Sequence, residues 1–428
     1  MTRQSTKWLG SLGAGFCALA LPSLAQAAEC PTNLPNIIYG SGGSAVTATM
    51  RQVAAALRAL PDPITVLWHD PGACIGFGHF VGGTIPGSTT RNVVYWDAAG
   101  VATTCQAPTA AGLPVDFSHM GNTADFCAAY PNGTPTGIGD FLGPVQTVNI
   151  ITDKDSSQKS ISAEALYYIL GLGATAANVS PWTNPRHMIL RTTSSFVHQF
   201  VAASVFDTPL KVFYDHPSIT GRTGIEVPGN PESVAQVVSA GASNPESPLA
   251  YVSGSAADAG RAQVKSLAYQ HFGQTCAYWP DSSESSLDKI NVRQGLYHFW
   301  TPGHFFAPVN SQGQVISSRP GADATERAAI AERVQRLIGY FSGELPSPAG
   351  ISPPIPQRII AAGDIPLCAM QVTREGTAGA VSSYAPEEPC GCYFEAIATG
   401  STSVCPVCET TDDCTGSQVC RSGYCEAY

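Results

Sequence analysis

The chain is poor in charged side chains. Charged residues make up 13% of its 428 positions, about half of the roughly 25% that soluble domains contain. Positive charge is the scarcer sign, since 22 Lys and Arg stand against 32 Asp and Glu and the formal net charge is -10. This shortage excludes nucleic acid and anionic membrane surfaces as partners, because both select basic surfaces. It does not exclude a small anion, which backbone N–H groups and a single Arg can hold.

Several motifs and runs are also missing. After residue 30 no stretch reaches the ~18 apolar residues of a membrane-spanning helix. The sequence contains neither a His-x-x-Glu-His zinc helix nor a Gly-x-Ser-x-Gly nucleophile elbow. The pairs His119-Met120 and His187-Met188 suggest soft-metal ligands, but two isolated pairs are more typical of packing residues. We therefore predict neither a metal site nor a cofactor.

The first residues have the pattern of a secretory signal. Arg3 and Lys7 form a basic start, residues 8–24 are short and mostly apolar, and Ala25-Gln-Ala27 is a small-residue cleavage site. We predict a signal peptide at 1–27 and a periplasmic or secreted product. Glu29 precedes Cys30, where a lipoprotein signal needs a small residue, so no lipid anchor is predicted.

Cysteine is abundant and unevenly distributed. Of the 14 Cys, one lies in the predicted signal, six are spread through the body and seven crowd the last 39 residues. In an exported chain this favours disulfides. The spacing Cys405-x-x-Cys408 permits a zinc site as the alternative. The odd number in the mature chain predicts at least one free or intermolecular thiol.

Strand and helix patterns alternate along the chain, which predicts an α/β fold. Strands are predicted at 36–39, 64–68, 92–96, 146–152, 188–190 and 249–252, and helices at 45–60, 162–171, 196–205, 256–269 and 325–342. The exposed face of the last helix carries charged residues, and Asp281, Asp288 and Lys289 are interpreted as a turn network. A Cys-rich tail is predicted from about residue 388, standing apart as a small module.

Three strand–turn–helix junctions share one design. They are Gly40–Ser44, Gly72–Cys74 and Arg191–Ser195, and each places small or hydroxylated residues where a helix would begin. Helix N-termini expose unpaired N–H groups and a partial positive charge, so three of them together would form an oxyanion site. Arg191 would add charge-assisted hydrogen bonds. The alternative is that each junction is an ordinary helix cap.

The order of these segments resembles one protein family. Gly40-Ser-Gly-Gly-Ser-Ala-Val46, the segment Ser162–Gly171 with Trp182-Thr-Asn-Pro185, and Arg191-Thr-Thr-Ser-Ser195 are similar to segments of the substrate-binding component of ABC phosphate importers, which has the type 2 periplasmic binding protein fold. The resemblance covers about residues 35–345. The tail, with Tyr278–Asp281 and Asp288–Arg293, resembles a secreted subgroup with a Cys-rich C-terminal piece.

The resemblance implies a two-lobed α/β protein with a small disulfide-rich C-terminal module. Lobe I would comprise 31–125 with 290–375, lobe II would comprise 126–289, and the anion would lie between them. It implies reversible, non-catalytic binding of a small oxyanion, phosphate first, for delivery to the membrane subunits of an ABC transporter. The candidate ligand-binding residues are Gly43, Ser44, Ala45, Cys74, Asn122, Arg191, Ser194 and Ser195.

The sequence departs from this family at three places. Phe196-Val197 replaces the Gly-Thr of the family's phosphate loop, and Gly121 or Asn122 falls where the family has an Asp that accepts the proton of hydrogen phosphate. Cys74 stands where a Ser is expected, and in a disulfide it would be lost to the ligand. An alternative function follows from these departures: an exported interaction protein that kept the fold and lost anion binding.

Overall fold

The computed structural model describes residues 28–87, 92–206, 224–400 and 405–427. The predicted signal peptide lies outside these residues. Within them, no helix combines the length and the apolar composition needed to cross a membrane.

Helices and strands alternate as predicted, and the α/β fold class is confirmed. The strands are β1 (Ile37–Gly42), β2 (Thr65–His69), β3 (Thr84–Ile85), β4 (Val93–Trp96), β5 (Ala102–Cys105), β6 (Leu113–Pro114), β7 (Phe117–Met120), β8 (Ile138–Asp153), β9 (Ser160–Ser162), β10 (Met188–Arg191), β11 (Ile225–Val227), β12 (Leu249–Ser253), β13 (Val264–Ser266), β14 (Ala268–Gln270), β15 (Trp300–Pro308), β16 (Val372–Arg374), β17 (Val381–Ser383), β18 (Val419–Arg421) and β19 (Tyr424–Glu426). The α-helices are α1 (Thr47–Arg58), α2 (Ala73–Val81), α3 (Ala163–Leu172), α4 (Ala174–Ala177), α5 (Phe196–Phe206), α6 (Asn230–Gly241), α7 (Gly254–Ala259), α8 (Ile290–Arg293), α9 (Ala324–Ser342), α10 (Ile355–Ala361) and α11 (Gly391–Thr399). Short 3-10 turns lie at η1 (Ser44–Val46), η2 (Ala124–Phe126), η3 (Pro185–His187), η4 (Leu367–Ala369) and η5 (Thr411–Asp413).

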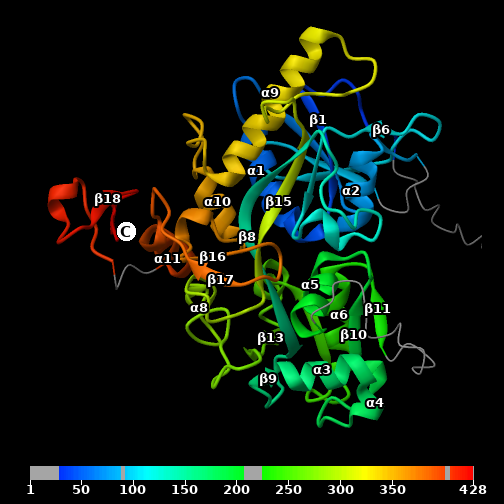
Figure 1. Ribbon diagram of the computed structural model, residues 1–428, viewed down its shortest axis with the longest axis vertical. Helices are drawn as coiled ribbons and strands as arrows, with labels where there is room; N and C mark the ends of the chain where they lie inside the picture. Colours follow the sequence, from blue (N-terminus) through cyan, green and yellow to red (C-terminus); the bar gives the residue numbers. More distant parts are fainter. Residues whose placement is uncertain (1–27, 88–91, 207–223, 401–404, 428) are drawn as a thin grey trace, which may run out of the picture.

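Most of the long strands belong to one sheet. Its order is β11-β10-β12-β8-β15-β7-β1-β2-β4-β5, and β13 also pairs with β8. Figure 1 shows this sheet running through two bodies, one with α1, α2 and α9 and the other with α3, α5 and α6. Apolar side chains bury one face of α1 and α9 against the first body, among them Met50, Val53, Leu57, Ile330, Val334 and Leu337. This burial is the main force holding the layers together.

Strand β8 joins the two halves of the sheet. Residues 138–147 pair antiparallel with β15, and residues 148–151 pair antiparallel with β12. The change of partner therefore falls after residue 147. The two bodies share a continuous stretch of hydrogen-bonded backbone.

One predicted helix is wrong. The helix expected at 256–269 ends at Ala259, and the chain turns at Gly260 into β13 and then β14. The physical reason is that the end of β8 offers an unpaired edge. Val264 and Ser266 pair there with Asp153 and Ile151, and these inter-strand hydrogen bonds replace the helical ones.

The predicted turn network forms a buried cluster of charges. The Lys289 ammonium lies 2.8 Å from Asp258 and 3.1 Å from Asp281, and Arg261 lies 2.8 Å from each of these two carboxylates. Asp288 accepts backbone N–H bonds from Ser282 and Ile290. These groups satisfy one another, so their role in the described structure is to fix the segment before α8.

The cysteines are paired as disulfides, as predicted. Three pairs lie in the body or join it to the tail, and three lie in the tail: Cys30–Cys105, Cys74–Cys127, Cys368–Cys390, Cys392–Cys405, Cys408–Cys420 and Cys414–Cys425. Cys276 is free and exposed, and it accounts for the odd number. The sulfurs of Cys408, Cys414 and Cys425 lie within 4.8 Å of one another, but disulfides occupy all three.

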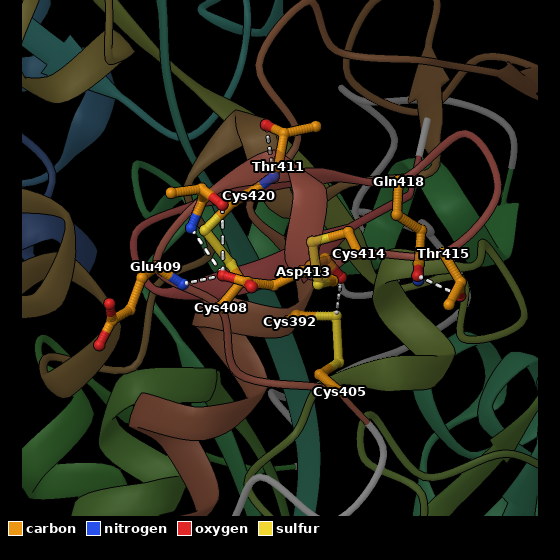
Figure 2. Close-up of a disulfide and its surroundings, with 12 residues drawn as sticks. Cys392, Cys405, Cys408, Glu409, Thr411, Asp413, Cys414, Thr415, Gln418 and Cys420 are labelled. Atoms are coloured by element: carbon orange, nitrogen blue, oxygen red, sulfur yellow. Dashed lines mark hydrogen bonds between the residues drawn. A yellow bond between two sulfur atoms is a disulfide. The ribbon is translucent and has the colours of Figure 1, made fainter.

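The outer part of the tail is built around its disulfides and one carboxylate. Figure 2 shows Asp413 between the sulfur pairs, where its Oδ2 accepts the N–H groups of Glu409 and Thr410 at 2.8 Å each. Thr415 and Gln418 hydrogen-bond at 3.3 Å across the next turn. Most side chains here are exposed, so covalent bonds and local hydrogen bonds take the place of a hydrophobic core.

The inner part of the tail does not stand apart, contrary to the sequence expectation. Phe394 of α11 is 2% exposed and belongs to the main hydrophobic core, and the Arg293 guanidinium lies 5.2 Å from its ring centroid. Glu426 of β19 caps the start of α11, since its carboxylate accepts the N–H groups of Cys392 at 2.9 Å and Tyr393 at 2.8 Å. A carboxylate there also matches the positive end of the helix dipole.

A buried ion pair stabilises the first body. The Arg319 guanidinium binds the carboxylate of Asp116, which also accepts the Tyr39 N–H at 2.8 Å, and Arg319 donates to the Ile37 carbonyl at 3.0 Å. Burial raises the pKa of Asp116 although the Arg319 guanidinium opposes that rise. The pair thereby fixes the loop before α9 to β1.

Replacing Arg319 by Ala should lower the free energy of unfolding by about 3 kcal/mol, because a buried carboxylate loses its partner. Urea unfolding at pH 7 measures the loss. Arg336→Ala is the matched control. Arg336 lies 4.0 Å from Glu332 at the surface, and such pairs contribute less than about 1 kcal/mol. Equal losses in the two variants would contradict this account.

Asp364 gives the stability a pH dependence. It is fully buried and accepts a hydrogen bond from Thr49, and burial raises its pKa to about 7 from 3.8. The folded protein therefore holds a proton that the unfolded chain releases between about pH 4 and pH 7. The stability contributed by this group is present below pH 4 and is lost as the pH rises through 7.

Asp364→Asn should remove this loss, because the amide can accept the same hydrogen bond and does not titrate. We expect the variant to unfold at higher urea concentration than the parent at pH 8 and at a similar concentration at pH 4. Urea titrations at both pH values test this. A variant less stable than the parent at pH 8 would show that the carboxylate is needed in its charged form.

Candidate functional site

The three junctions singled out in the sequence line one pocket. Its walls are Gly43, Ser44, Ala45, Gly72, Ala73, Arg191, Ser195, Phe196, Val197, Pro228 and Asn230. The cavity is small, with a volume of about 10 Å³. Such a cavity fits a water molecule or an ion of a few atoms and is too small for an organic metabolite.

Helix N-termini surround this pocket. Ser44 opens the turn η1 that leads into α1, Ala73 opens α2, Phe196 opens α5 and Asn230 opens α6. The residues at the N-cap positions of η1, α2 and α6 are Gly43, Gly72 and Gly229, and none of them supplies a side-chain cap. No side chain at these three cap positions competes with a ligand for the first N–H groups, although the Cys74 N–H of α2 lies 3.5 Å from the Ser194 carbonyl.

Gly72 lets two of these elements meet. Its φ of +122° lies in the region that L side chains rarely adopt, and a Cβ there would stand 3.0 Å from the Ser194 Oγ. The turn before α2 thus packs directly against the loop before α5. Because the chain needs both the unusual backbone angle and the missing side chain, Gly is required at this position.

Arg191 supplies the positive charge of the pocket. It ends β10 and is 1% exposed. Its guanidinium donates to the Asn230 side-chain oxygen and, at 3.0 Å, to the Pro228 carbonyl, both from the segment that opens α6. These two acceptors hold the guanidinium in place at the pocket wall.

A neutral histidine supports Arg191. The Tyr251 hydroxyl accepts the backbone N–H of Arg191 at 3.4 Å and lies 2.7 Å from His198 Nδ1. Burial, together with the Arg191 charge, lowers the pKa of His198 to about 3. His198 is therefore uncharged near neutral pH, and Arg191 is the cation that faces the pocket.

The described lining residues include neither a carboxylate nor a histidine. The hydroxyls of Ser44 and Ser195 consequently lack the adjacent base that a serine nucleophile requires.

Five of the eight residues predicted as ligand-binding line the pocket, and three do not. Gly43, Ser44, Ala45, Arg191 and Ser195 are brought together. Ser194 lies beside them but packs against the turn at Gly72. The Cys74 sulfur is bonded to Cys127, so the inclusion of a Cys74 thiol among the ligands is wrong. Asn122 donates to the Gln199 Oε1 at 2.7 Å and does not line the pocket.

Sequence reasoning missed Pro228 and Asn230. The signal was present: a short strand runs into Pro228-Gly-Asn-Pro231 ahead of a helix. Pro in the first turn after a Gly is a helix-start pattern. This fourth junction has the same design as the other three.

Phe196 and Gln199 contact the segment after β7. A Cβ on Gly121 would stand 2.6 Å from the Phe196 ring, so the ring packs closely against that glycine. Gln199 contacts both Asn122 and the Cys74 sulfur, the latter at 3.1 Å from its Nε2. The place where the sequence lacks an acidic residue is thus occupied by contacts between α5 and the segment after β7.

No family model matches the chain, and no curated protein matches it. Among solved structures it is similar to a putative phosphate ABC transporter substrate-binding protein with bound phosphate from Clostridium perfringens, with 11% identity, 78% of this chain and 100% of that chain covered, and a TM-score of 0.46. A phosphate binding protein from Stenotrophomonas maltophilia is 12% identical, with 78% of this chain and 91% of that chain covered and a TM-score of 0.45. An ABC-type phosphate transport receptor from Vibrio cholerae is 13% identical, with 77% of this chain and 99% of that chain covered and a TM-score of 0.44. At these identities and TM-scores the similarities assign no ligand to this chain.

Proposed function

We propose that this protein binds a small oxyanion, phosphate first, without catalysing a reaction. The observation that carries the proposal is the convergence of four helix starts and the buried Arg191 on one small pocket. The net charge of -10 does not attract anions from solution, so the affinity must come from local N–H groups and one guanidinium. Phosphate, sulfate and molybdate all have the size and the oxygen acceptors that such a pocket can hold.

The proposed setting is outside the cytoplasm, with delivery to the membrane subunits of an ABC importer. Six disulfides support an oxidising compartment. Delivery to a transporter is the part that the sequence resemblance contributes. Two lobes, 31–125 with 290–375 and 126–289, would close around the anion as the backbone bends where they join.

The second candidate function is an exported interaction protein that no longer binds an anion. The contacts of Phe196 with Gly121 and of Gln199 with Asn122 favour it, because they join the two walls through side chains of the protein itself. In that case the pocket would be a remnant, and the tail or another surface would carry the function.

Isothermal titration of the mature protein with phosphate separates the two candidates. Under the first, phosphate binds, and Arg191→Ala lowers the affinity by at least ~100-fold, because charge-assisted bonds from a buried guanidinium are lost. Arg186→Ala is the matched control, since Arg186 is an exposed residue of the same lobe, and it should leave the affinity unchanged. Absence of heat with phosphate, sulfate and molybdate at millimolar concentration would leave the interaction protein as the function.

The pocket should discriminate poorly between phosphate and sulfate. No carboxylate stands among its described lining residues, so no charged acceptor there favours the proton of hydrogen phosphate or repels an ion without one. We expect the two dissociation constants to agree within ~tenfold. Sulfate affinity should also stay constant from pH 5 to pH 8, because the pKa of His198 lies near 3. A strong preference for phosphate would show that an acceptor outside the described lining takes part.

A further inference from the structure

A second and larger cavity lies at the other end of α5. Its volume is about 540 Å³, within the roughly 300–1,000 Å³ of small-molecule sites. The last turn of α5, the segment after β14, the residue pair before β15 and the β16–β17 hairpin form its walls, through Ala203, Ser204, Val205, His271, Phe272, His298, Arg374, Ala378, Gly379, Ala380 and Val381.

Arg374 is the charged residue of this cavity. It is 8% exposed, and one of its terminal nitrogens donates to the His298 carbonyl at 2.9 Å. Its guanidinium carbon lies 4.5 Å from the Trp300 ring centroid and 5.8 Å from that of Phe200. In the part of the chain that the structure describes, its Nε has no acceptor, and no carboxylate lies within ion-pair distance of it.

Burial lowers the pKa of Arg374 to about 10, so the side chain stays protonated at pH 7. A buried guanidinium normally has an anionic partner, because other contacts offset only part of the hydration free energy that it loses on burial. The two aromatic rings offset some of the lost hydration free energy through cation–π contact. Arg374 lines the cavity and has one acceptor among the described residues, the His298 carbonyl. A carboxylate fits a guanidinium with two parallel bonds.

The rest of the wall is uncharged, and three of its side chains carry aromatic rings. The rings of His271 and His298 stack with centroids 4.2 Å apart at 15°, and Phe272 beside them is 42% exposed. Burial lowers the pKa of His298 to about 4 and also lowers that of His271, so both imidazoles are neutral at pH 7. Ser204 adds a buried hydroxyl that has no hydrogen-bond partner among the described residues.

We propose that this cavity binds a small organic acid with a planar, aromatic body. The carboxylate pairs with Arg374, and the ring packs on the stacked His271 and His298 and on Phe272. The site shares no lining residue with the oxyanion pocket, which lies at the first turn of α5. The two ligands differ in kind as well, because an inorganic oxyanion leaves most of this cavity unfilled.

Benzoate is the probe, and benzamide is its neutral match in shape. Titration of the full mature chain at pH 7, followed by calorimetry or by ligand-observed NMR, should show saturable benzoate binding and at least ~tenfold weaker benzamide binding. Arg374→Gln should weaken benzoate by at least ~tenfold. Arg191→Ala should leave benzoate binding unchanged, which separates this site from the oxyanion pocket.

Phe272→Ala keeps the test decisive if Arg374→Gln does not fold. Phe272 is exposed enough for its loss to spare the fold, as a thermal melt will verify, and benzoate affinity should fall by ~threefold or more. The proposal is overturned if benzoate does not bind up to about 10 mM. It is also overturned if benzamide binds equally well, or if neither substitution changes the benzoate affinity.

Discussion

The pairing of β8 with two different partners is the constraint on which the rest of the structure depends. The first part of this 16-residue strand pairs with β15 in one body, and the later part pairs with β12 and β13 in the other. All its residues from Pro144 to Asp153 are buried. The backbone hydrogen bonds of a single strand therefore set the spacing of the two bodies. That spacing brings the starts of α1 and α2 within reach of Arg191 and α5.

Helix α5 connects the two cavities of the molecule. Its first residues, Phe196 and Val197, line the small pocket, and Ala203 to Val205 line the larger one. All of these except Ser204 are buried, and the helix belongs to the main hydrophobic core.

Local sequence patterns predicted much of this structure. The strand–turn–helix alternation predicted the α/β fold, and the helix predicted at 162–171 begins after its capping residue Ser162. The three Gly- and Ser-rich junctions predicted which loops would meet. Features that depend on tertiary pairing were out of reach. The chain after Ala259 becomes a strand because β8 has a free edge, and no short-range pattern encodes that edge. The environment of Arg374 likewise depends on Trp300 and His298, which are distant in the sequence.

The capping of α11 by Glu426 links the core of the protein to the redox state of its surroundings. The disulfide of Cys425 with Cys414 holds the residue next to Glu426, and the carboxylate of Glu426 completes the first turn of a helix that buries Phe394. Reduction of the tail would release β19 and leave two N–H groups of α11 without their acceptor. A thiol-rich environment would therefore loosen a core helix as well as unfold a surface module. The tail in this way makes an oxidising environment a condition for the complete native structure.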